Sequence, residues 1–300
     1  MPKAAVCGAM NADLIGTPRS LFRPGDSIPG TVTVRAGGVG RNIAEALIRL
    51  GCSVSMYTAL GEDDRSVILR ASAERIGLDL SGSETLAGER CGTYLCINDS
   101  EGNVAAAISD MEICARMTPE FYAPRLAEIN RVDFAVIDGN MPEETIRYLT
   151  ERITVPVFAD CVSVEKAVRF RGSLKGLCAI KPNLPEAEAL TGETGAERAA
   201  DALLAAGVAH VFITLGPRGV YAAGADGRAL LPCVPGEIRS TNGCGDVFLA
   251  AAAVRIMRGG DTLTAARYAL AAAALNARSD EAVNPLLSAQ AVEKLVYNAK

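Results

Sequence analysis

The chain has 300 residues, of which 49% are hydrophobic and 22% are charged, the balance of a compact globular protein with a sizeable core. Its net charge of −5, with no run of Lys or Arg, argues against nucleic acid as a partner, because proteins that bind phosphate backbones are normally basic. The single histidine, His210, excludes Ser-His and Cys-His triads and argues against a zinc site.

Short apolar runs alternate with stretches of helical periodicity along most of the chain. The runs predicted as buried strands are Ala4–Cys7, Val54–Thr58, Phe134–Ile137, Val157–Ala159, Cys178–Ile180 and Val211–Leu215. The stretches predicted as helices are Asn42–Leu50, Asp64–Ile76, Pro142–Arg152, Leu184–Leu190 and Ala196–Ala206, with an Ala-rich helical region from Asp246 to Asn298. This alternation predicts an α/β fold with a mostly parallel sheet and helices on both of its faces.

Two regions, residues 14–36 and 89–112, break this alternation. The first contains the alternating stretch Thr31–Val34, and the second contains Cys91–Ile97 and Val104–Ile108 on either side of a polar turn. Both regions are typical of exposed antiparallel strands, so we expect a small sheet that projects from the main body. No linker or repeat divides the remainder, and residues 1–300 are predicted to form one domain that carries this sheet.

The N-terminal segment and the cysteines bear on the location of the protein. Met1–Met10 lacks the long apolar core and the cleavage site of a secretory signal. The most apolar segments, Val247–Val254 and Tyr268–Leu275, are too short to span a bilayer. Nine cysteines without a C-x-x-C pair indicate reduced thiols. We therefore expect a cytoplasmic protein without a membrane partner.

The strongest local signal is the segment Ser240-Thr241-Asn242-Gly243-Cys244-Gly245-Asp246, which leads into an apolar helix. Its two glycines allow a tight turn of converging N–H groups, and the start of the helix adds unpaired N–H groups and a positive dipole end. These features favour an anion site, beside which Asp246 can accept the proton of an attacking hydroxyl. Taken alone, the segment also suits a plain helix cap, since Asp is a favoured N-cap residue.

A second glycine-rich segment, Arg35-Ala36-Gly37-Gly38-Val39-Gly40-Arg41-Asn42, precedes a predicted helix. Its glycines let a ligand approach the backbone, and Asn42 can donate and accept hydrogen bonds to sugar hydroxyls. The chain has no Gly-Lys-Ser/Thr sequence, which excludes a Walker A loop. A plain loop-to-helix turn explains this segment equally well by itself.

Polar residues also follow three of the predicted strands. Asn11 and Asp13 follow the first, Lys181-Pro182-Asn183 with Glu186 follow the fifth, and Thr214, Gly216 and Gly219 follow the sixth. In open α/β sheets, ligands bind beyond the carboxyl ends of the strands. Each group alone suits a cap or a turn, but their common placement predicts one site at one edge of the sheet.

On these residues the chain resembles the ribokinase-like (PfkB) family over nearly its whole length. The block Gly-Gly-Val-Gly-Arg-Asn-Ile-Ala at 37–44 and the block Asn-Gly-Cys-Gly-Asp at 242–246 look like the two signatures of that family, with Lys-Pro-Asn-x-x-Glu at 181–186 between them. The resemblance implies a ribokinase-like fold and phosphorylation of a sugar or nucleoside hydroxyl with ATP and Mg²⁺. It also implies that residues 14–36 and 89–112 form a lid, which in this family often mediates homodimer contacts.

Further segments are similar to the pseudouridine kinase subgroup of this family. They are Ile108–Met111, Asp138–Glu144, Phe158–Lys166 and Asn284–Ser288. The similarity implies transfer to the 5′-hydroxyl of pseudouridine, which would give pseudouridine 5′-phosphate. The implied candidates around the base and the 5′ end of the substrate are Ile108, Asp110, Asn140, Asp160 and Lys166.

The family resemblance implies roles for the other site residues as well. Asp246 would be the general base, and Gly243, Cys244 and Gly245 would form an N–H cradle for the transferred phosphoryl group. The residues implied to hold the ribose are Asn11, Asp13, Gly37, Gly38 and Asn42. Those implied to bind ATP are Asn183, Glu186, Thr214, Gly216, Gly219 and Asn276, with Glu186 acting on Mg²⁺ through water.

The chain departs from the family pattern at three positions. Asn242 stands where Thr is usual, and Cys244 stands where Ala is usual. Ser240 stands where many members have an acidic residue that supports a monovalent cation. The general base and the glycines are intact, so the resemblance still predicts activity, whereas it puts the requirement for a monovalent cation in doubt.

Two other functions fit the same residues. One is a kinase of this family that acts on ribose, adenosine or a phosphorylated ketose, which a substrate panel would separate. The other is a nucleoside-binding sensor without turnover, against which the intact Asp246 and its glycines argue. A nicotinamide-dependent dehydrogenase is discarded, because Cys7-Gly8-Ala9-Met10-Asn11 replaces the G-x-G-x-x-G turn after the first strand.

Overall fold

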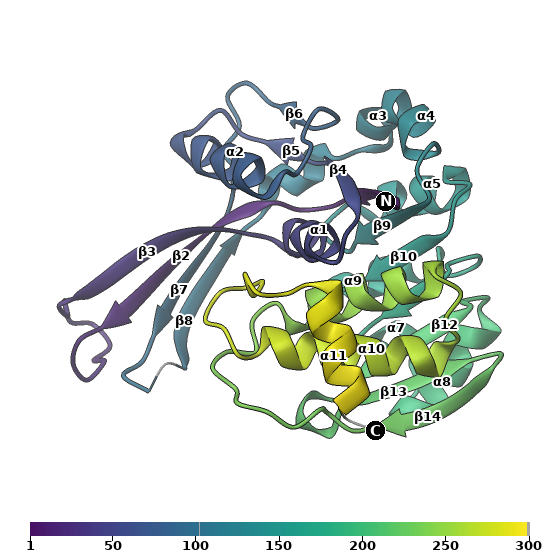
Figure 1. Ribbon diagram of the computed structural model, residues 1–300. Coiled ribbons are helices and arrows are strands. Elements are labelled where there is room, and N and C mark those ends of the chain that lie inside the picture. The colour runs from purple at the N-terminus through teal and green to yellow at the C-terminus, as the bar shows by residue number, and fades with distance from the viewer. Residues whose placement is uncertain (102, 299–300) are drawn as a thin grey trace.

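The computed structural model describes residues 1–101 and 103–298. Its centre is an eight-stranded sheet with the order β14-β13-β12-β11-β10-β9-β1-β4 (Figure 1). Six strands run parallel: β1 Lys3–Cys7, β4 Ser53–Tyr57, β9 Phe134–Asp138, β10 Val157–Asp160, β11 Ala179–Lys181 and β12 His210–Thr214. The predicted mostly parallel sheet is confirmed, and each predicted strand overlaps one of these six.

Helices cover both faces of this sheet, as the alternating pattern predicts. The longer ones are α1 Val39–Arg49, α2 Asp64–Ile76, α5 Glu143–Arg152, α7 Leu184–Thr191, α8 Ala196–Ala205, α9 Cys244–Met257, α10 Thr262–Asn276 and α11 Ala289–Asn298. Short α-helices are α3 Pro119–Tyr122, α4 Leu126–Ile129 and α6 Val164–Ala167, and the 3₁₀ turns are Glu112–Arg116, Ala123–Arg125, Val168–Phe170 and Gly216–Arg218. Figure 1 shows α9, α10 and α11 together on one side of the sheet.

Successive residues of the central strands enter two separate cores. Ala4 and Val6 of β1 pack with α1 and α9, whereas Ala5 and Cys7 pack with the cluster that includes α5 and α8. Side chains of a strand point alternately to its two faces, so a strand buried on both faces must be apolar throughout. This requirement explains why β1 and β9 appear in the sequence as unbroken apolar runs.

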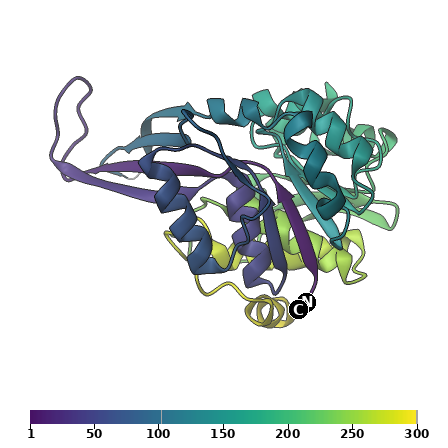
Figure 2. The ribbon, with the colours of Figure 1, turned by 90° about the horizontal axis from the view of Figure 1, so that it is seen from above.

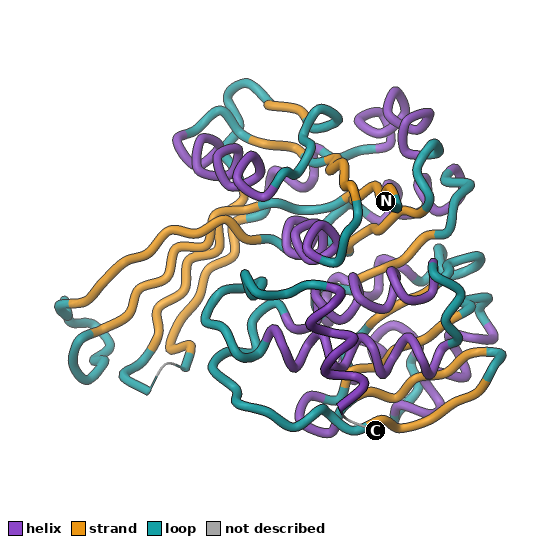
Figure 3. Tube along the Cα trace, in the orientation of Figure 1, coloured by secondary structure: helices purple, strands orange, loops and turns teal. Residues whose placement is uncertain are grey.

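A second sheet of four strands projects from the body and is called the lid sheet. Its order is β3-β2-β7-β8, with β2 Asn11–Pro18, β3 Gly30–Gly37, β7 Gly92–Asn98 and β8 Val104–Asp110. Figures 2 and 3 show these strands leaving the body side by side. They come from the two regions that break the α/β alternation, although the first strand begins at Asn11, earlier than the predicted boundary at 14.

Several elements differ from the sequence-based prediction. The hairpin β13 Val220–Gly224 and β14 Gly227–Leu231 extends the main sheet in antiparallel pairing and was not predicted, nor was the small pair β5 Ala59–Leu60 and β6 Glu84–Thr85. Within the described part of the chain, none of the helices combines the length and apolar character that a membrane span needs.

The strand order places a crevice at a defined point of the sheet. From β1 the chain returns to the sheet as β4 on one side, while β9 lies on the other side of β1. Such a reversal of direction leaves a crevice beyond the carboxyl ends of the strands, where open α/β sheets bind ligands. Asn11, Asp138, Asp160 and Lys181 all lie at or just after these strand ends.

Candidate active site

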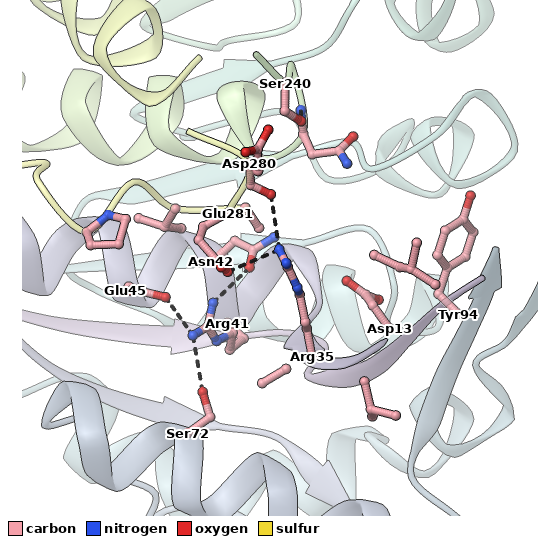
Figure 4. Close-up of a pocket in the computed structure, with 18 of the residues that line it drawn as sticks. Asp13, Arg35, Arg41, Asn42, Glu45, Ser72, Tyr94, Ser240, Asp280 and Glu281 are labelled. Carbon is pink, nitrogen blue, oxygen red and sulfur yellow. Dashed lines mark hydrogen bonds and ion pairs between the residues drawn. The ribbon is translucent and has the colours of Figure 1, made fainter. Parts of the chain in front are cut away.

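A cleft of about 1590 Å³ opens between the lid sheet and the body. Its walls are Asp13 and Tyr94 of the lid sheet, Asn42 of α1, and the loop 238–243 that precedes α9 (Figure 4). The cleft exceeds the volume of ~300–1,000 Å³ that is common for small-molecule pockets, so a nucleoside fits easily. Figure 4 also shows Arg35 reaching from β3 toward Asp280, whose carbonyl oxygen it contacts at 3.1 Å.

Asp246 lies in the first turn of α9, at the inner end of this region. Its side chain is only 8% exposed, and its Oδ2 accepts a hydrogen bond of 2.8 Å from Asn42 Nδ2. Burial, with a further contribution from the negative charge of Asp160, raises the pKa of Asp246 to about 7. A carboxylate with a pKa near neutrality is well matched to take a proton at physiological pH.

The segment before α9, a predicted anion site, presents unpaired backbone donors. Gly243, the N-cap, has a left-handed backbone with φ +69°, and the N–H of Cys244 is already bonded to the carbonyl of Thr241. Within the described chain, the N–H groups of Gly243, Gly245 and Asp246 have no hydrogen-bond partner. The free donors are therefore those of Gly243, Gly245 and Asp246, whereas the N–H of Cys244, which was also predicted to contribute, is occupied by the carbonyl of Thr241.

Asn276, a predicted ATP contact, instead holds this loop in place by hydrogen bonds to its backbone. Its side chain is fully buried at the end of α10, and its Nδ2 donates to the carbonyls of Asn242 and Ala282, each at 3.1 Å. Its Oδ1 accepts from the N–H of Asn284 at 2.8 Å. With both ends of the amide engaged by backbone, Asn276 holds the loop in shape and offers ATP no side-chain group.

The residues predicted to hold the sugar converge on one side of Asp246. Asn11 and Asp13 lie at the start of β2, where Asn11 Nδ2 donates to Asp13 Oδ1 at 2.6 Å. Burial raises the pKa of Asp13. Gly37 ends β3 opposite them and Gly38 is the N-cap of α1, where a side chain would meet the carbonyl of Ala9 at 2.6 Å. The structure thus brings the predicted sugar-binding residues together.

A buried ion pair orients Asn42. Arg41 Nη2 lies 2.6 Å from Glu45, and both side chains are 6% exposed. Arg41 Nη1 donates to Asn42 Oδ1 at 3.2 Å (Figure 4). The amide nitrogen of Asn42 is left to donate to Asp246. An amide held at both ends keeps one orientation, so Arg41 is a positioning residue for the contact between Asn42 and the candidate base.

The predicted nucleotide-side residues follow the ends of β11 and β12. Asn183 caps α7 and forms a reciprocal capping box with Glu186, whose carboxylate accepts both the N–H and the Nδ2 of Asn183, at 2.9 and 2.8 Å. Burial raises the pKa of Glu186. Thr214 ends β12 and bridges to Asn183, while Gly216 and Gly219 form the following turn. These residues share one edge of the sheet, as expected.

The candidates for base recognition are only partly brought together. Asn140 is buried after β9, and its Oδ1 accepts a 2.7 Å hydrogen bond from Lys166 Nζ. Asp160 lies deeper, paired with Lys181 at 2.8 Å. Ile108 is 65% exposed, and neither it nor Asp110 lines the cleft. The pairing of Ile108 with Leu95 puts it on the face of the lid sheet opposite Asp13, because neighbouring residues alternate between faces.

Comparison with known proteins decides the family. The family model described as pfkB family carbohydrate kinase matches residues 1–289. The chain belongs to this family. It is 31% identical to an uncharacterized sugar kinase, YeiI, from Escherichia coli (strain K12), over 97% of this chain and 82% of that one. It is 30% identical to the pseudouridine kinase of the same organism, over 98% of this chain and 96% of that one.

The fold comparison agrees with the family model. A carbohydrate kinase from Agrobacterium tumefaciens superposes with a TM-score of 0.88 at 28% identity, covering 99% of this chain and 97% of that one. The resemblance to the ribokinase-like fold is thereby confirmed, and the chain is a sugar or nucleoside kinase of the PfkB family.

Some residues central to the site of this PfkB-family kinase were not assigned a role from the sequence. Lys181 lies beneath the start of α9, and Asp138 holds the backbone after β1 by accepting from the N–H groups of Ala9 and Asn140, at 2.8 and 2.9 Å. One signal was available, since charged residues directly end the apolar runs of β9, β10 and β11. A charge at that position faces the ligand crevice in parallel sheets.

Proposed function

We propose that this kinase transfers the γ-phosphoryl group of ATP to the 5′-hydroxyl of pseudouridine. The observation that carries the proposal is the placement of Asp246, a buried carboxylate with a pKa near 7, beside the unpaired N–H groups that begin α9. The carboxylate accepts the hydroxyl proton, and the N–H groups stabilise negative charge on the phosphoryl group. The 30% identity to a pseudouridine kinase over almost the full chain supports the choice of nucleoside.

In this proposal the protein acts by positioning and by charge stabilisation. Asn11, Asp13 and Asn42 hold the ribose hydroxyls, with Gly37 and Gly38 leaving room for the sugar against the backbone. Asp246 then lies within reach of the 5′-hydroxyl and takes its proton as the new bond to phosphorus forms. Phosphoryl transfer requires little covalent participation of the protein, so orientation and electrostatics supply most of the rate.

The nucleotide side fits ATP with Mg²⁺. The unpaired N–H groups at the start of α9 suit a phosphate, and the turn at Gly216 and Gly219 suits the rest of the nucleotide. When bound, ATP supplies the phosphoryl group and Mg²⁺ neutralises its charge. Both oxygens of Glu186 already accept hydrogen bonds from Asn183, so we propose that Glu186 acts on the metal through water. The cytoplasmic location inferred from the sequence stays a prediction.

The preference for pseudouridine over uridine tests the choice of substrate. The C-linked base of pseudouridine offers an additional ring N–H, and a site built to pair such a donor can reject the analogue that lacks it by up to ~10⁴–10⁵. We expect kcat/KM for pseudouridine to exceed that for uridine, and Lys166→Met to reduce the ratio because Lys166 supports Asn140. The exposed neighbour variant Glu165→Gln is the matched control.

The same panel of substrates can contradict the choice of pseudouridine. Higher kcat/KM for uridine, adenosine, ribose or a phosphorylated ketose would reject pseudouridine while leaving the family assignment intact. If no acceptor leads to ATP consumption but the protein binds a nucleoside, the result would favour a nucleoside-binding sensor without turnover.

Independence of K⁺ is expected from Ser240. A serine hydroxyl carries only a dipole, which offsets less of the dehydration cost of a monovalent cation than a carboxylate does. The Ser240 Oγ instead accepts from the N–H of Asn242 at 3.2 Å, a local bond that shapes the loop without a cation. We expect kcat/KM at fixed ionic strength to be unchanged when K⁺ is replaced by tetramethylammonium. A drop of about tenfold, ~1.4 kcal/mol, would show that the cation site functions.

We also propose a homodimer formed through the lid sheets. The face opposite the cleft carries Val32, Leu95, Ile97 and Ile108, which are all exposed, Val32 by 72%. A contiguous apolar face on a sheet is typical of a surface that a partner covers. Sedimentation equilibrium should give a dimer, and Val32→Asp with Ile108→Asp should give a monomer. Leu230→Asp, on the exposed edge strand β14, is the control, and a monomeric wild type would contradict the proposal.

A further inference from the structure

Three neighbouring strands of the main sheet end in charged residues that lie side by side. Asp138 ends β9, Asp160 ends β10 and Lys181 ends β11, and the strand register pairs Asp160 with both of the others. Lys181 Nζ lies 2.8 Å from Asp160 Oδ2, and both side chains are less than 10% exposed. Lys181 is thus a buried cation set among carboxylates at the edge of the sheet where the candidate active site lies.

Gly245 makes room for this ammonium group. A Cβ at Gly245 would lie 2.8 Å from Lys181 Nζ, so a side chain there would displace the ammonium group from this position. The backbone of Gly245 is not left-handed, so no conformational demand explains glycine at this helical position. Gly243 differs, because its φ of +69° and the nearby carbonyl of Ala282 both require glycine. The absent side chain at 245 lets this positive charge lie beside the backbone of Gly245, whose N–H is one of the free donors.

We propose that Lys181 is a cationic residue of the anion site, where its ammonium group stabilises negative charge on the phosphoryl group during transfer. The inference rests on the proposed phosphoryl transfer and adds a charge-stabilising residue to it. A fixed charge in a water-poor site acts without reorganisation as charge develops, which makes it more effective than the same charge in solvent. Asp160 holds the ammonium group in place from the other side.

A purely structural role is the competing explanation, in which Lys181 only neutralises the buried Asp160. The two explanations differ for variants that remove the charges separately and together. Asp160→Asn keeps the lysine, and its remaining carbonyl oxygen can still accept the 2.8 Å bond from the N–H of Val162. The double variant Asp160→Asn/Lys181→Met removes both partners of the buried ion pair together, so it should fold even if Lys181→Met alone does not.

The experiment measures binding as well as turnover. Calorimetry gives the affinity of each variant for ADP and for ADP with aluminium fluoride, a planar mimic of the phosphoryl group in transfer, in the presence of Mg²⁺ and the nucleoside. We expect the double variant to bind ADP like the wild type but to lose about 10²-fold in affinity for the aluminium fluoride complex and in kcat, the loss typical of removing one anion-hole donor. Asp160→Asn should keep most of that affinity, and melting should show both variants folded.

The opposite order of affinities for the aluminium fluoride complex would overturn the inference. If the double variant binds the aluminium fluoride complex as tightly as the wild type while Asp160→Asn loses affinity, Lys181 serves only to pair with Asp160. Failure of the proposed function has a different signature, because the wild type would then transfer phosphate to no nucleoside or sugar at all. That outcome would remove the proposed function and the role of Lys181 together.

Discussion

Replacing Asp246 by Asn is expected to lower turnover by about 10²–10⁴ without loss of nucleoside binding. Asn has nearly the same shape and its amide oxygen can still accept the hydrogen bond from Asn42, but it cannot take up the proton of the 5′-hydroxyl. The measurement is kcat and KM with saturating ATP, alongside calorimetric binding of the nucleoside. Asp261→Asn, at the N-cap of α10, is the matched control, since it makes the same chemical change at a helix start away from the cleft.

The pH profile and the stability of this variant give independent readouts. The raised pKa of Asp246 means that kcat/KM of the wild type should fall as the pH drops below about 7, when the base becomes protonated. A carboxyl whose folded-state pKa lies above its ordinary value is destabilising once ionised, so its contribution to stability is lost as the pH rises through about 7. Asp246→Asn should therefore not lower Tm at pH 8. Turnover within a few-fold of wild type would remove Asp246 from the mechanism.

Replacing Gly243 by Ala is expected to reduce turnover by about 10²-fold, because it displaces the N–H donors of the anion site. The left-handed backbone with φ +69° disfavours any side chain, and a Cβ there would overlap with the carbonyl of Ala282. The loop must then move away from the segment that Asn276 braces. Nucleoside affinity should change little, since Asn11 and Asp13 hold the sugar from the lid sheet.

Gly77→Ala is the matched control for the Gly243 variant. Gly77 ends α2 with φ +71°, almost the same backbone conformation, but a Cβ there would meet no atom within 4 Å. Gly77→Ala should lower the free energy of unfolding by about 1–2 kcal/mol, because Ala is disfavoured in the left-handed conformation. It should leave turnover unchanged. Equal losses of turnover in both variants would show that general destabilisation, rather than displacement of the anion site, explains the effect.

The fold was largely predictable because its signals are local. Unbroken apolar runs such as Phe134–Ile137 are required of strands buried on both faces, and the glycine-rich segments before α1 and α9 mark where the backbone must turn closely. The hairpin β13–β14 was missed, because its pairing with the sheet depends on β12. Such pairing depends on tertiary context more than on any local pattern.

The sequence by itself determined the α/β architecture and the projecting sheet, since both depend on residue types at short spacing, and it predicted Asp246 as the general base through the family resemblance. Only the tertiary structure decided what the neighbouring residues do. It assigned Asn276 to bracing the loop, turned Ile108 to the face away from the cleft, and set Lys181 under Gly245. These assignments depend on contacts that the local sequence pattern does not show, or on which face of a strand points to the cleft. Burial then fixes their chemistry, because it raises the pKa of Asp246 and makes each unpaired charge costly.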